Sequence, residues 1–357
     1  MHERIDDVRI NNIEEVITPE ELIKEVPASA NIEKQVFSSR NTISRILHKK
    51  DGRLLVIIGP CSIHDPKAAI EYAEKLSVAS EKYSKYLEIV MRVYFEKPRT
   101  TIGWKGLIND PDLNGSNNIN KGLKIARRLL VDISSLGLPT ATEFLDPITP
   151  QYIGDLISWG AIGARTTESQ IHRQLASGLS APIGFKNSTD GSIQIAIDAI
   201  KSASNPHMFL SVTKKGNSAI VSTSGNSDCH VIHRGGSNGT NYSEKPIIAT
   251  TELLKTNGIE TGIMVDLSHA NSNKNFHNQI IAADSVSNQI TKGNREIVGI
   301  MIESNLVEGS QGISSDNTNL VYGQSVTDAC LGWDATSILL EKMSYAVEKK
   351  FVNSIES

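Results

Sequence analysis

One short stretch of the chain concentrates positive charge. The formal net charge of the whole chain is -4, yet four cations fall within residues 91–106. They are Arg92, Lys97, Arg99 and Lys105. Four cations cannot be buried together without partners, and Arg and Lys are the side chains that best bind phosphate and carboxylate groups. The stretch therefore indicates a site for an anionic ligand, with a solvated basic loop as the plainer alternative.

Charged or reactive side chains also stand at the ends of the other apolar runs that we interpret as strands. They are Cys61, Glu143, Arg165, Lys186, Arg234, His269 and Glu303. Each one alone has an ordinary explanation, such as a helix cap or a local ion pair. In a barrel of parallel strands, however, the carboxyl ends meet at one mouth, where active sites lie. The repetition after strand upon strand therefore predicts one active site built from all of them.

The candidate residues divide into two chemical groups. Six are cations, and so many predict more than one anionic group on the ligands, such as two phosphates and a carboxylate. The six are Arg92, Lys97, Arg99, Arg165, Lys186 and Arg234.

The second group has the side-chain types of metal ligands. It comprises Cys61, His269, Glu303 and Asp328. A mixed sulfur, nitrogen and oxygen set suits a divalent transition metal better than Mg²⁺ or Ca²⁺. Because the four lie far apart in sequence, their spacing alone leaves two alternatives open: Cys61 as a small buried residue and His269 as a partner of a backbone carbonyl.

Short apolar runs alternate with helix-like periodicity along most of the chain. The expected strands are 53–58, 87–93, 139–144, 161–164, 182–185, 229–233, 262–267 and 297–302, and the expected helices are about 66–83, 118–136, 150–158, 168–177, 191–203, 243–257, 275–292 and 328–350. Continuous apolar runs are typical of strands covered on both faces. Eight such alternations predict an α/β fold of the (β/α)8 TIM-barrel class, with a doubly wound open sheet as the alternative.

The chain is expected to have an extension in front of this barrel. Residues 1–50 contain an arm with one short strand near Val8 and two helices, one starting near Thr18 and one over 32–47. Residues 51–357 form the barrel, and residues 208–223 read as a β-hairpin inserted before the sixth barrel strand. The extension and the hairpin add no chemistry of the kind found at the strand ends, so we hypothesise a further, regulatory binding function for them.

Composition excludes several classes of protein. No apolar stretch is long enough to span a membrane, and the charged N-terminus does not resemble a secretory signal. Three widely spaced cysteines do not form a disulfide framework, which favours a reducing cytoplasm. The mild acidity gives no reason to expect nucleic acid as a partner.

Six sequence motifs together resemble a known enzyme family. They are GPCSIH at 59–64, KPRTT at 97–101, GARTTESQ at 163–170, GFKN at 184–187, HRGG at 233–236 and DLSHANSNK at 266–274. The combination resembles the class I, feedback-regulated 3-deoxy-D-arabino-heptulosonate 7-phosphate (DAHP) synthases over about residues 6–345. The resemblance implies a TIM barrel, usually tetrameric, that condenses phosphoenolpyruvate with erythrose 4-phosphate and releases phosphate. This reaction begins the shikimate pathway to chorismate and the aromatic amino acids.

The resemblance also implies roles for individual residues. The metal ligands fall on Cys61, His269, Glu303 and Asp328, with Mn, Fe, Co or Zn as the ion. The phosphoenolpyruvate contacts fall on Arg92, Lys97, Glu143, Arg165, Lys186 and Arg234, and the sugar phosphate contacts on Lys97, Pro98, Arg99 and Thr100. Lys97 is then a candidate proton donor to the aldehyde oxygen, with a Schiff-base role as the rival interpretation. Departures from the family pattern are small: His233 replaces an aliphatic residue and Ile102 a Val.

An aromatic amino acid effector is expected beside the inserted hairpin, with the arm of a neighbouring subunit closing over it. The matching positions are Asp6, Asp7, Gln151, Leu179, Ser180, Phe209, Ser211 and Val221. Ser at position 211 favours phenylalanine over tyrosine, whereas Pro147 argues weakly against the phenylalanine-sensitive form.

Two other functions compete with this interpretation. The first is the related synthase that uses arabinose 5-phosphate to form a 3-deoxy-octulosonate 8-phosphate, whose corresponding box has Ala-Asn in place of Pro98-Arg99. The second is a non-catalytic phosphosugar-binding barrel, which the loss of a metal ligand would favour; none is lost here.

Overall fold

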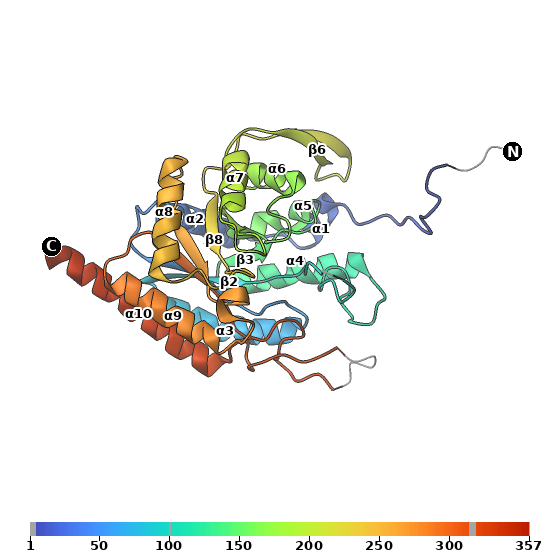
Figure 1. Ribbon diagram of the computed structural model, residues 1–357. Helices are drawn as coiled ribbons and strands as arrows, with labels where there is room; N and C mark the ends of the chain where they lie inside the picture. Colours follow the sequence, from blue (N-terminus) through green and yellow to red (C-terminus); the bar gives the residue numbers. More distant parts are fainter. Residues whose placement is uncertain (1–4, 100, 314–318, 357) are drawn as a thin grey trace.

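Eight parallel strands close into a barrel in a computed structural model that describes residues 5–99, 101–313 and 319–356 (Figure 1). The barrel strands are β1 (Leu54–Gly59), β2 (Leu87–Arg92), β3 (Thr140–Glu143), β4 (Trp159–Ile162), β5 (Ile183–Lys186), β8 (His230–His233), β9 (Ile263–Asp266) and β10 (Ile297–Glu303). Their order is β1-β10-β9-β8-β5-β4-β3-β2, so that β10 pairs with β1. The predicted (β/α)8 barrel is confirmed, and the alternative of an open sheet is excluded.

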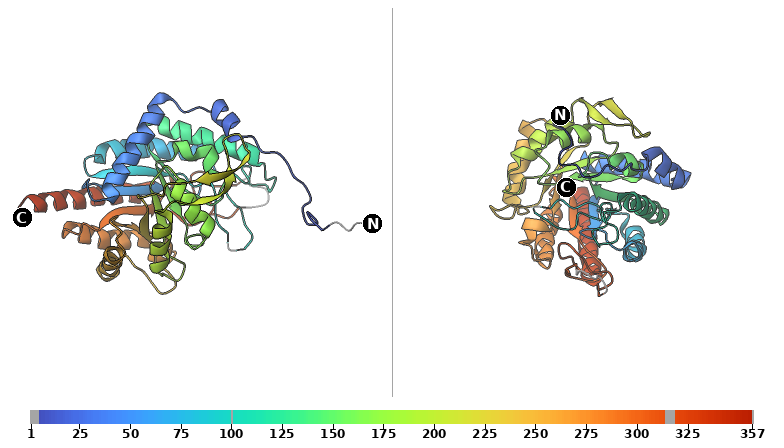
Figure 2. Two further views of the ribbon diagram at one scale, coloured as in Figure 1. Left: turned by 90° about the horizontal axis from the view of Figure 1, so that it is seen from above. Right: turned by 90° about the vertical axis from the view of Figure 1, so that its right-hand side faces the viewer.

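Helices surround the strands on the outside of the barrel (Figure 2). They are α3 (Pro66–Tyr83), α4 (Ile119–Ser135), α5 (Pro150–Ile153) with the 3-10 turn Gly154–Leu156, α6 (Gln170–Gly178), α7 (Gln194–Ala203), α8 (Glu244–Thr256), α9 (Asn278–Thr291) and α10 (Trp333–Glu356). Local sequence sets their ends. At the start of α3, for example, Asp65 accepts a hydrogen bond from the backbone N–H of Lys67 at 2.8 Å, and Pro66 occupies the first helical position.

The last helix begins five residues later than the periodicity predicted. Residues ahead of Trp333 pair instead with the end of the barrel, where the backbone N–H of Leu331 donates to the carbonyl of Glu303 at 3.0 Å. Cys330 forms a second short bridge, to Gly309. This pairing keeps Asp328 on a loop that passes over the barrel mouth.

Side-chain alternation along the strands connects the barrel core to the mouth. Val90, Ala141, Met264 and Met301 belong to one buried cluster inside the barrel. Successive side chains on a strand point to opposite faces, so residues two positions further on point to the same interior. Those residues are Arg92, Glu143, Asp266 and Glu303. The hydrophobic pattern of each strand therefore aims its last polar residue into the mouth.

The N-terminal extension closes the opposite end of the barrel. It contains α1 (Pro19–Glu25) and α2 (Ala30–Leu47), and Ile43, Ile46 and Leu47 of α2 pack in the same interior cluster as Trp159. Ahead of α1, residues 5–17 contain no strand, so the short strand predicted near Val8 is wrong. Glu15 and Ile17 are hydrogen-bonded to Asn120 of α4, and the arm before them extends away from the barrel (Figure 1).

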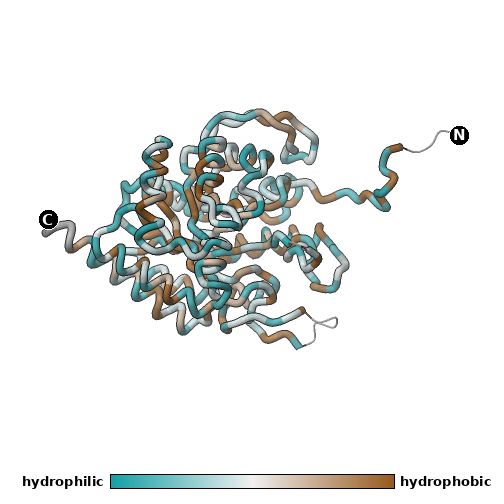
Figure 3. Tube along the Cα trace, in the orientation of Figure 1, coloured by the Kyte–Doolittle hydropathy of each residue, from teal (hydrophilic) through white to brown (hydrophobic). Residues whose placement is uncertain are grey.

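The predicted hairpin insertion is confirmed before the sixth barrel strand, β8. It consists of β6 (Met208–Val212) and β7 (Ser218–Ser222), and Gly216 in the turn has a φ of +79° that favours glycine. Met208, Leu210 and Ile220 are exposed on the hairpin, and Figure 3 shows hydrophobic residues along both the hairpin and the arm.

Two further observations complete the description of the fold. No helix in the described part of the chain is both long and apolar enough to cross a membrane. Cys61, Cys229 and Cys330 are all buried and free.

Candidate active site and metal centre

The predicted site residues come together at the carboxyl ends of the strands. Arg92, Glu143, Lys186 and Glu303 are the last residues of β2, β3, β5 and β10. Cys61, Arg165, Arg234 and His269 lie on the loops that directly follow β1, β4, β8 and β9. Each of the eight barrel strands, or the loop that follows it, thus contributes a residue to one mouth, as expected for a barrel of this class.

Arg92 and Glu303 form the fixed floor of the mouth. Arg92 is fully buried, and its Nη2 lies 2.9 Å from Glu303 Oε1. Its Nε donates to the carbonyl oxygen of Pro60 at 3.0 Å, and its guanidinium lies 3.6 Å from the ring centroid of Tyr94. A buried ion pair is stable only when its remaining donors are satisfied, and the Arg92 guanidinium meets this condition.

The Lys97 ammonium group lies next to Cys61, on the loop that follows β1. Its Nζ lies 3.1 Å from Cys61 Sγ and 3.2 Å from the Cys61 carbonyl oxygen. Burial and the neighbouring Glu303 carboxylate raise the pKa of the Cys61 thiol, against the lowering effect of Lys97. Without a further cation the sulfur is therefore a neutral thiol, whereas a bound metal ion would convert it to the thiolate.

Three of the four predicted metal ligands form one cluster. The sulfur of Cys61 and carboxylate oxygens of Glu303 and Asp328 all lie within 4.8 Å of one another. His269 stands at the edge of this cluster, with its Nε2 3.9 Å from Glu303 Oε1. The structure brings all four residues to one place, although His269 is not among the three that converge most closely.

The hydrogen bonds around His269 indicate where its proton lies. Ser268 Oγ donates to Asp266 Oδ1 at 2.7 Å, so it accepts from His269 Nδ1, which is 2.7 Å away. Nδ1 is also 2.9 Å from Asp266 Oδ2. In the neutral imidazole, Nε2 therefore presents a lone pair toward the Glu303 carboxylate. Two acceptors that face each other at 3.9 Å fit a cation between them. The donor set therefore fits a divalent transition metal.

Asp266 is a site residue that the sequence analysis did not select. It is fully buried at the end of β9, and its Oδ2 lies 3.1 Å from Lys186 Nζ. The strand register could have identified it, because it stands two residues after the inward-facing Met264.

Two further guanidinium groups at the mouth have no carboxylate partner. Arg165 is exposed and Arg234 half-buried, and neither forms an ion pair with a residue in the described ranges. Burial lowers the pKa of Arg234, and the like charge of Arg165 adds to this effect against the opposing pull of Asp266. Two neighbouring cations that repel each other form an attractive site for an anion.

The Arg234 loop is held by a buried polar network. Asn187 Oδ1 accepts a hydrogen bond from the Arg234 backbone N–H at 2.8 Å. His233 is fully buried and contacts the Asn241 carbonyl oxygen at 2.7 Å and Thr250 Oγ1 at 2.9 Å. Burial lowers the pKa of His233 to about 4, so it is neutral. The unusual histidine of the HRGG motif is thus a satisfied structural residue.

The remaining predicted substrate residues lie around the same mouth. Glu143 is buried against Gly163, where an added Cβ would come within 2.3 Å of its Oε1. On the loop after β2, Pro98 is half-buried and Arg99 is exposed. A backbone hydrogen bond of 2.9 Å, from the N–H of Lys97 to the carbonyl oxygen of Lys105, joins the two ends of this loop. Thr100 lies outside the described residues.

The predicted effector positions lie on three parts of the chain: the hairpin with α5, the segment after α6, and the N-terminal arm. Phe209 and Val221 pair across the hairpin, where Ser211 lies on β6, and Lys214 Nζ donates a hydrogen bond to the carbonyl oxygen of Gln151 on α5. Leu179 and Ser180 follow α6 directly. Asp6 and Asp7 lie on the projecting arm and are not brought to the hairpin of their own chain (Figure 1).

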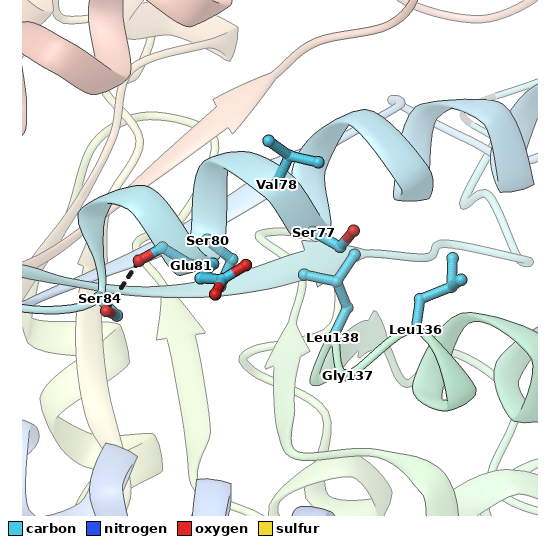
Figure 4. Close-up of a pocket in the computed structure, with 8 residues that line it drawn as sticks. All are labelled: Ser77, Val78, Ser80, Glu81, Ser84, Leu136, Gly137 and Leu138. Carbon is cyan, nitrogen blue, oxygen red and sulfur yellow. Dashed lines mark hydrogen bonds between the residues drawn. The ribbon is translucent and has the colours of Figure 1, made fainter.

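A surface pocket lies between α3 and the turn after α4, away from the mouth (Figure 4). It is lined by Ser77, Val78, Ser80, Glu81, Ser84, Leu136, Gly137 and Leu138. The lining contains none of the predicted site residues and no cation, and it borders the amino ends of the strands, because α3 ends just before β2 begins. This pocket therefore does not alter the assignment of the site.

Comparison with known proteins gives consistent similarities over nearly the whole chain. A profile of the DAHP synthetase I family matches residues 25–341. The Escherichia coli K12 protein named phospho-2-dehydro-3-deoxyheptonate aldolase, Phe-sensitive, is 56% identical over 98% of this chain and 99% of its own. A Trp-sensitive protein of the same name from Buchnera aphidicola is 53% identical over 98% and 99%. The solved structure of a phospho-2-dehydro-3-deoxyheptonate aldolase from Francisella tularensis is similar with a TM-score of 0.94 and 53% identity, over 96% of this chain and 99% of that one.

Proposed function

We infer, since the chain belongs to the DAHP synthetase I family, that its barrel mouth carries out the family's reaction. The protein is a phospho-2-dehydro-3-deoxyheptonate aldolase, a 3-deoxy-7-phosphoheptulonate synthase that begins aromatic biosynthesis. One observation supports this assignment of residues: a set of sulfur, nitrogen and oxygen donors and several unpaired cations converge at one mouth. The roles below are proposed for individual side chains.

Cys61, His269, Glu303 and Asp328 hold a divalent transition metal ion, which is Mn, Fe, Co or Zn. The support is the mutual approach of three of these groups within 4.8 Å and the inward lone pair of the fourth. When bound, such an ion polarises the aldehyde oxygen of the sugar phosphate and stabilises negative charge on it. The protein's own contribution is to fix the donors in place: Arg92 holds Glu303, and Ser268 and Asp266 hold His269.

Phosphoenolpyruvate is bound by the cations that line the mouth. Arg165 and Arg234 take one of its anionic groups, because neither has a carboxylate partner among the described residues. Lys186 and Arg92 lie deeper and are already oriented by Asp266 and Glu303. Together with Lys97 and Glu143, they orient the enol carbon toward the aldehyde and offset the repulsion between two anionic substrates.

Lys97 donates a proton to the aldehyde oxygen as the new carbon–carbon bond forms. The support is its position beside Cys61, at 3.1 Å, which places the ammonium group next to the donor set. Water then adds to the second carbon of the former enol, and the tetrahedral intermediate releases phosphate by cleavage of its C–O bond. A Schiff base would need a neutral amine, and the contacts of the Lys97 ammonium with two acceptors of Cys61 favour the charged donor.

Erythrose 4-phosphate binds on the loop after β2 through Lys97, Pro98, Arg99 and Thr100. Arg99 is exposed at the rim, where its guanidinium can reach a phosphate without breaking an existing ion pair. The dipeptide Pro98-Arg99 also favours erythrose 4-phosphate over arabinose 5-phosphate.

The N-terminal extension and the hairpin form a regulatory unit in a homotetramer. The projecting arm and the exposed apolar residues of the hairpin support this proposal, because both surfaces are available to a neighbouring subunit. An aromatic amino acid, phenylalanine, binds there at the effector positions named above. Relatives of similar identity are named Phe-sensitive and Trp-sensitive, so the preference for phenylalanine depends on Ser211. The three free cysteines support a cytoplasmic location.

One assay tests this function against its competitors. Purified protein is incubated with phosphoenolpyruvate and either erythrose 4-phosphate or arabinose 5-phosphate, and phosphate release and product mass are measured. We expect phosphate and a heptulosonate phosphate with erythrose 4-phosphate only, and loss of both on treatment with a chelator. Reaction with arabinose 5-phosphate alone would establish the octulosonate synthase, and no reaction with either sugar would establish a binding barrel.

A further inference from the structure

Asp266 occupies a central position between the two halves of the site. It is the last residue of β9 and is fully buried from solvent. Its Oδ1 accepts hydrogen bonds from the Ser268 backbone N–H at 3.0 Å and from Ser268 Oγ at 2.7 Å. Its Oδ2 lies 2.9 Å from His269 Nδ1 and 3.1 Å from Lys186 Nζ. Oδ1 therefore accepts hydrogen bonds, whereas Oδ2 makes ion-pair contacts with His269 and Lys186 and has no hydrogen bond of good geometry among the described residues.

The charge of Asp266 is held by this environment. The His269 imidazole and the Lys186 ammonium group lie 2.9 Å and 3.1 Å from the same carboxylate oxygen, Oδ2, and Ser268 lies against the other oxygen. An ionised carboxylate is an acceptor at both oxygens, so it can accept hydrogen bonds from Ser268 on one side and attract His269 and Lys186 on the other, which a neutral side chain of the same size cannot.

The backbone at His269 also needs this support. His269 has a φ of +57°, in the left-handed region that residues other than glycine rarely adopt. Asn271 Nδ2 donates to the Asp266 carbonyl oxygen at 2.8 Å, so the turn is tied to Asp266 through both main chain and side chain. Such strained conformations persist where the surrounding contacts over-determine them.

We propose that Asp266 is a positioning residue that serves the metal centre and the phosphoenolpyruvate subsite at once. Its Oδ2, together with the Ser268 hydroxyl, faces His269 Nδ1 and so holds the ring with Nε2 toward Glu303. The same Oδ2 holds the Lys186 ammonium group inside the mouth. The inference rests on the roles proposed above for His269 and Lys186. It differs from a simpler role, in which Asp266 only neutralises a buried lysine and has no effect on metal binding.

The substitution Asp266→Asn tests the proposal because it preserves shape. An amide has one accepting and one donating edge. If its oxygen faces Ser268, its NH₂ group faces both His269 and Lys186; if it is flipped, its NH₂ group faces the Ser268 N–H. Either orientation places a donor against a donor. The side chain at position 266 then loses its favourable contacts either with Ser268 or with His269 and Lys186.

The readout is the binding of each ligand separately, without turnover. Calorimetric titration of chelator-stripped protein with Mn²⁺ measures the metal side, and titration with phosphoenolpyruvate alone measures the substrate side. We expect Asp266→Asn to weaken Mn²⁺ binding by about 10–100-fold, the usual effect of removing a partner of a metal-binding histidine. We expect phosphoenolpyruvate binding to weaken in the same variant by about tenfold.

Two matched variants separate the contact with His269 from the contact with Lys186. Ser268→Ala removes a hydroxyl that contacts His269 and not Lys186, so it should weaken Mn²⁺ binding and spare phosphoenolpyruvate binding. Lys186→Met should do the reverse. If Asp266→Asn does not fold, as judged by circular dichroism and its melting curve, the same two titrations are made on Asp266→Glu, which keeps the charge but displaces the carboxylate; weaker binding of both ligands supports the proposal, and unchanged Mn²⁺ binding overturns it.

The outcomes are distinct. Weakened binding of both ligands in Asp266→Asn, with folding intact, supports the proposal. Full Mn²⁺ binding with reduced phosphoenolpyruvate binding overturns it, because Asp266 would then serve Lys186 alone. Retention of both ligands also overturns it. Wild-type protein that binds neither ligand would instead overturn the proposed function on which the inference rests.

Discussion

Replacement of Glu96 by glutamine should change how stability depends on pH. Glu96 directly precedes Lys97, is only 5% exposed, and contacts the Thr149 side chain and the Asp146 backbone. Burial is the main cause that raises the pKa of Glu96 from 4.5 to about 8, and the negative charges of Asp146 and Glu143 add to it. The carboxyl group is therefore protonated in the folded protein at neutral pH.

The direction of the effect follows from this raised pKa. The folded state binds the Glu96 proton more tightly than the unfolded chain does, so its contribution to stability is complete below about pH 4.5 and is lost as the pH rises through about 8. Each unit of pKa difference corresponds to about 1.4 kcal/mol. The full cost of ionising Glu96 is then on the order of 3–5 kcal/mol, and relaxation or entry of water into the loop would make it smaller.

Glutamine keeps the neutral shape at every pH. Urea unfolding at fixed protein concentration, at about pH 5.5 and about pH 9, gives the free energy of unfolding of wild type and Glu96→Gln. We expect the variant to be more stable than wild type at the higher pH by at least about 1–3 kcal/mol, with a smaller difference or none at the lower pH. The control Glu260→Gln changes an exposed residue and should follow the wild-type curve. Parallel curves for Glu96→Gln and wild type would refute the burial of an uncharged carboxyl group.

Four further predictions concern the site. Cys61→Ser should weaken binding of a divalent metal and lower turnover while the fold stays intact, because a hydroxyl replaces a thiolate poorly; unchanged metal content and activity would remove Cys61 from the site. Lys97→Ala and Arg165→Ala should each lower kcat/KM by about 2–4 kcal/mol equivalent in steady-state assays, because each loses a charge-assisted contact to a substrate; a smaller loss would contradict their roles. Arg99→Ala should raise KM for erythrose 4-phosphate more than for phosphoenolpyruvate, and equal increases would contradict its assignment. Phenylalanine should inhibit wild type more tightly than tyrosine, by about 1–3 kcal/mol at most, and Ser211→Gly should reduce this preference; tighter inhibition by tyrosine in wild type would refute the role of Ser211.

The barrel could be predicted from the sequence because its signal is local. A short continuous apolar run such as Leu54–Gly59 is typical of a strand covered on both faces, and eight such runs alternating with helices leave few topologies. The cations and metal-ligand types could be selected for the same reason, since each stands at the end of such a run. The strand bounds were less certain: the fourth strand spans Trp159–Ile162 and not 161–164, so Arg165 stands three residues beyond its end and not directly after it.

Features that depend on contacts between distant segments were harder to predict. Asp266 was overlooked because its importance comes from Lys186 and Ser268, and sequence periodicity does not report such a bridge. The start of α10 was placed too early, since the pairing of Leu331 with Glu303 competes with helix formation. The strand predicted in the arm does not form, because a strand needs a partner and the arm pairs with none in the described part of the chain.

The claim that one metal centre drives the reaction can be tested most directly with cobalt. Chelator-stripped protein is titrated with Co²⁺ while sulfur-to-cobalt charge-transfer absorbance and phosphate release are followed in the same samples. We expect both signals to rise together and to saturate at a single ion per chain, and the absorbance to be absent in Cys61→Ser, because the thiolate is the source of the band. Full phosphate release by the stripped protein, or activity restored by cobalt without the sulfur band, would contradict a metal centre built on Cys61, His269, Glu303 and Asp328.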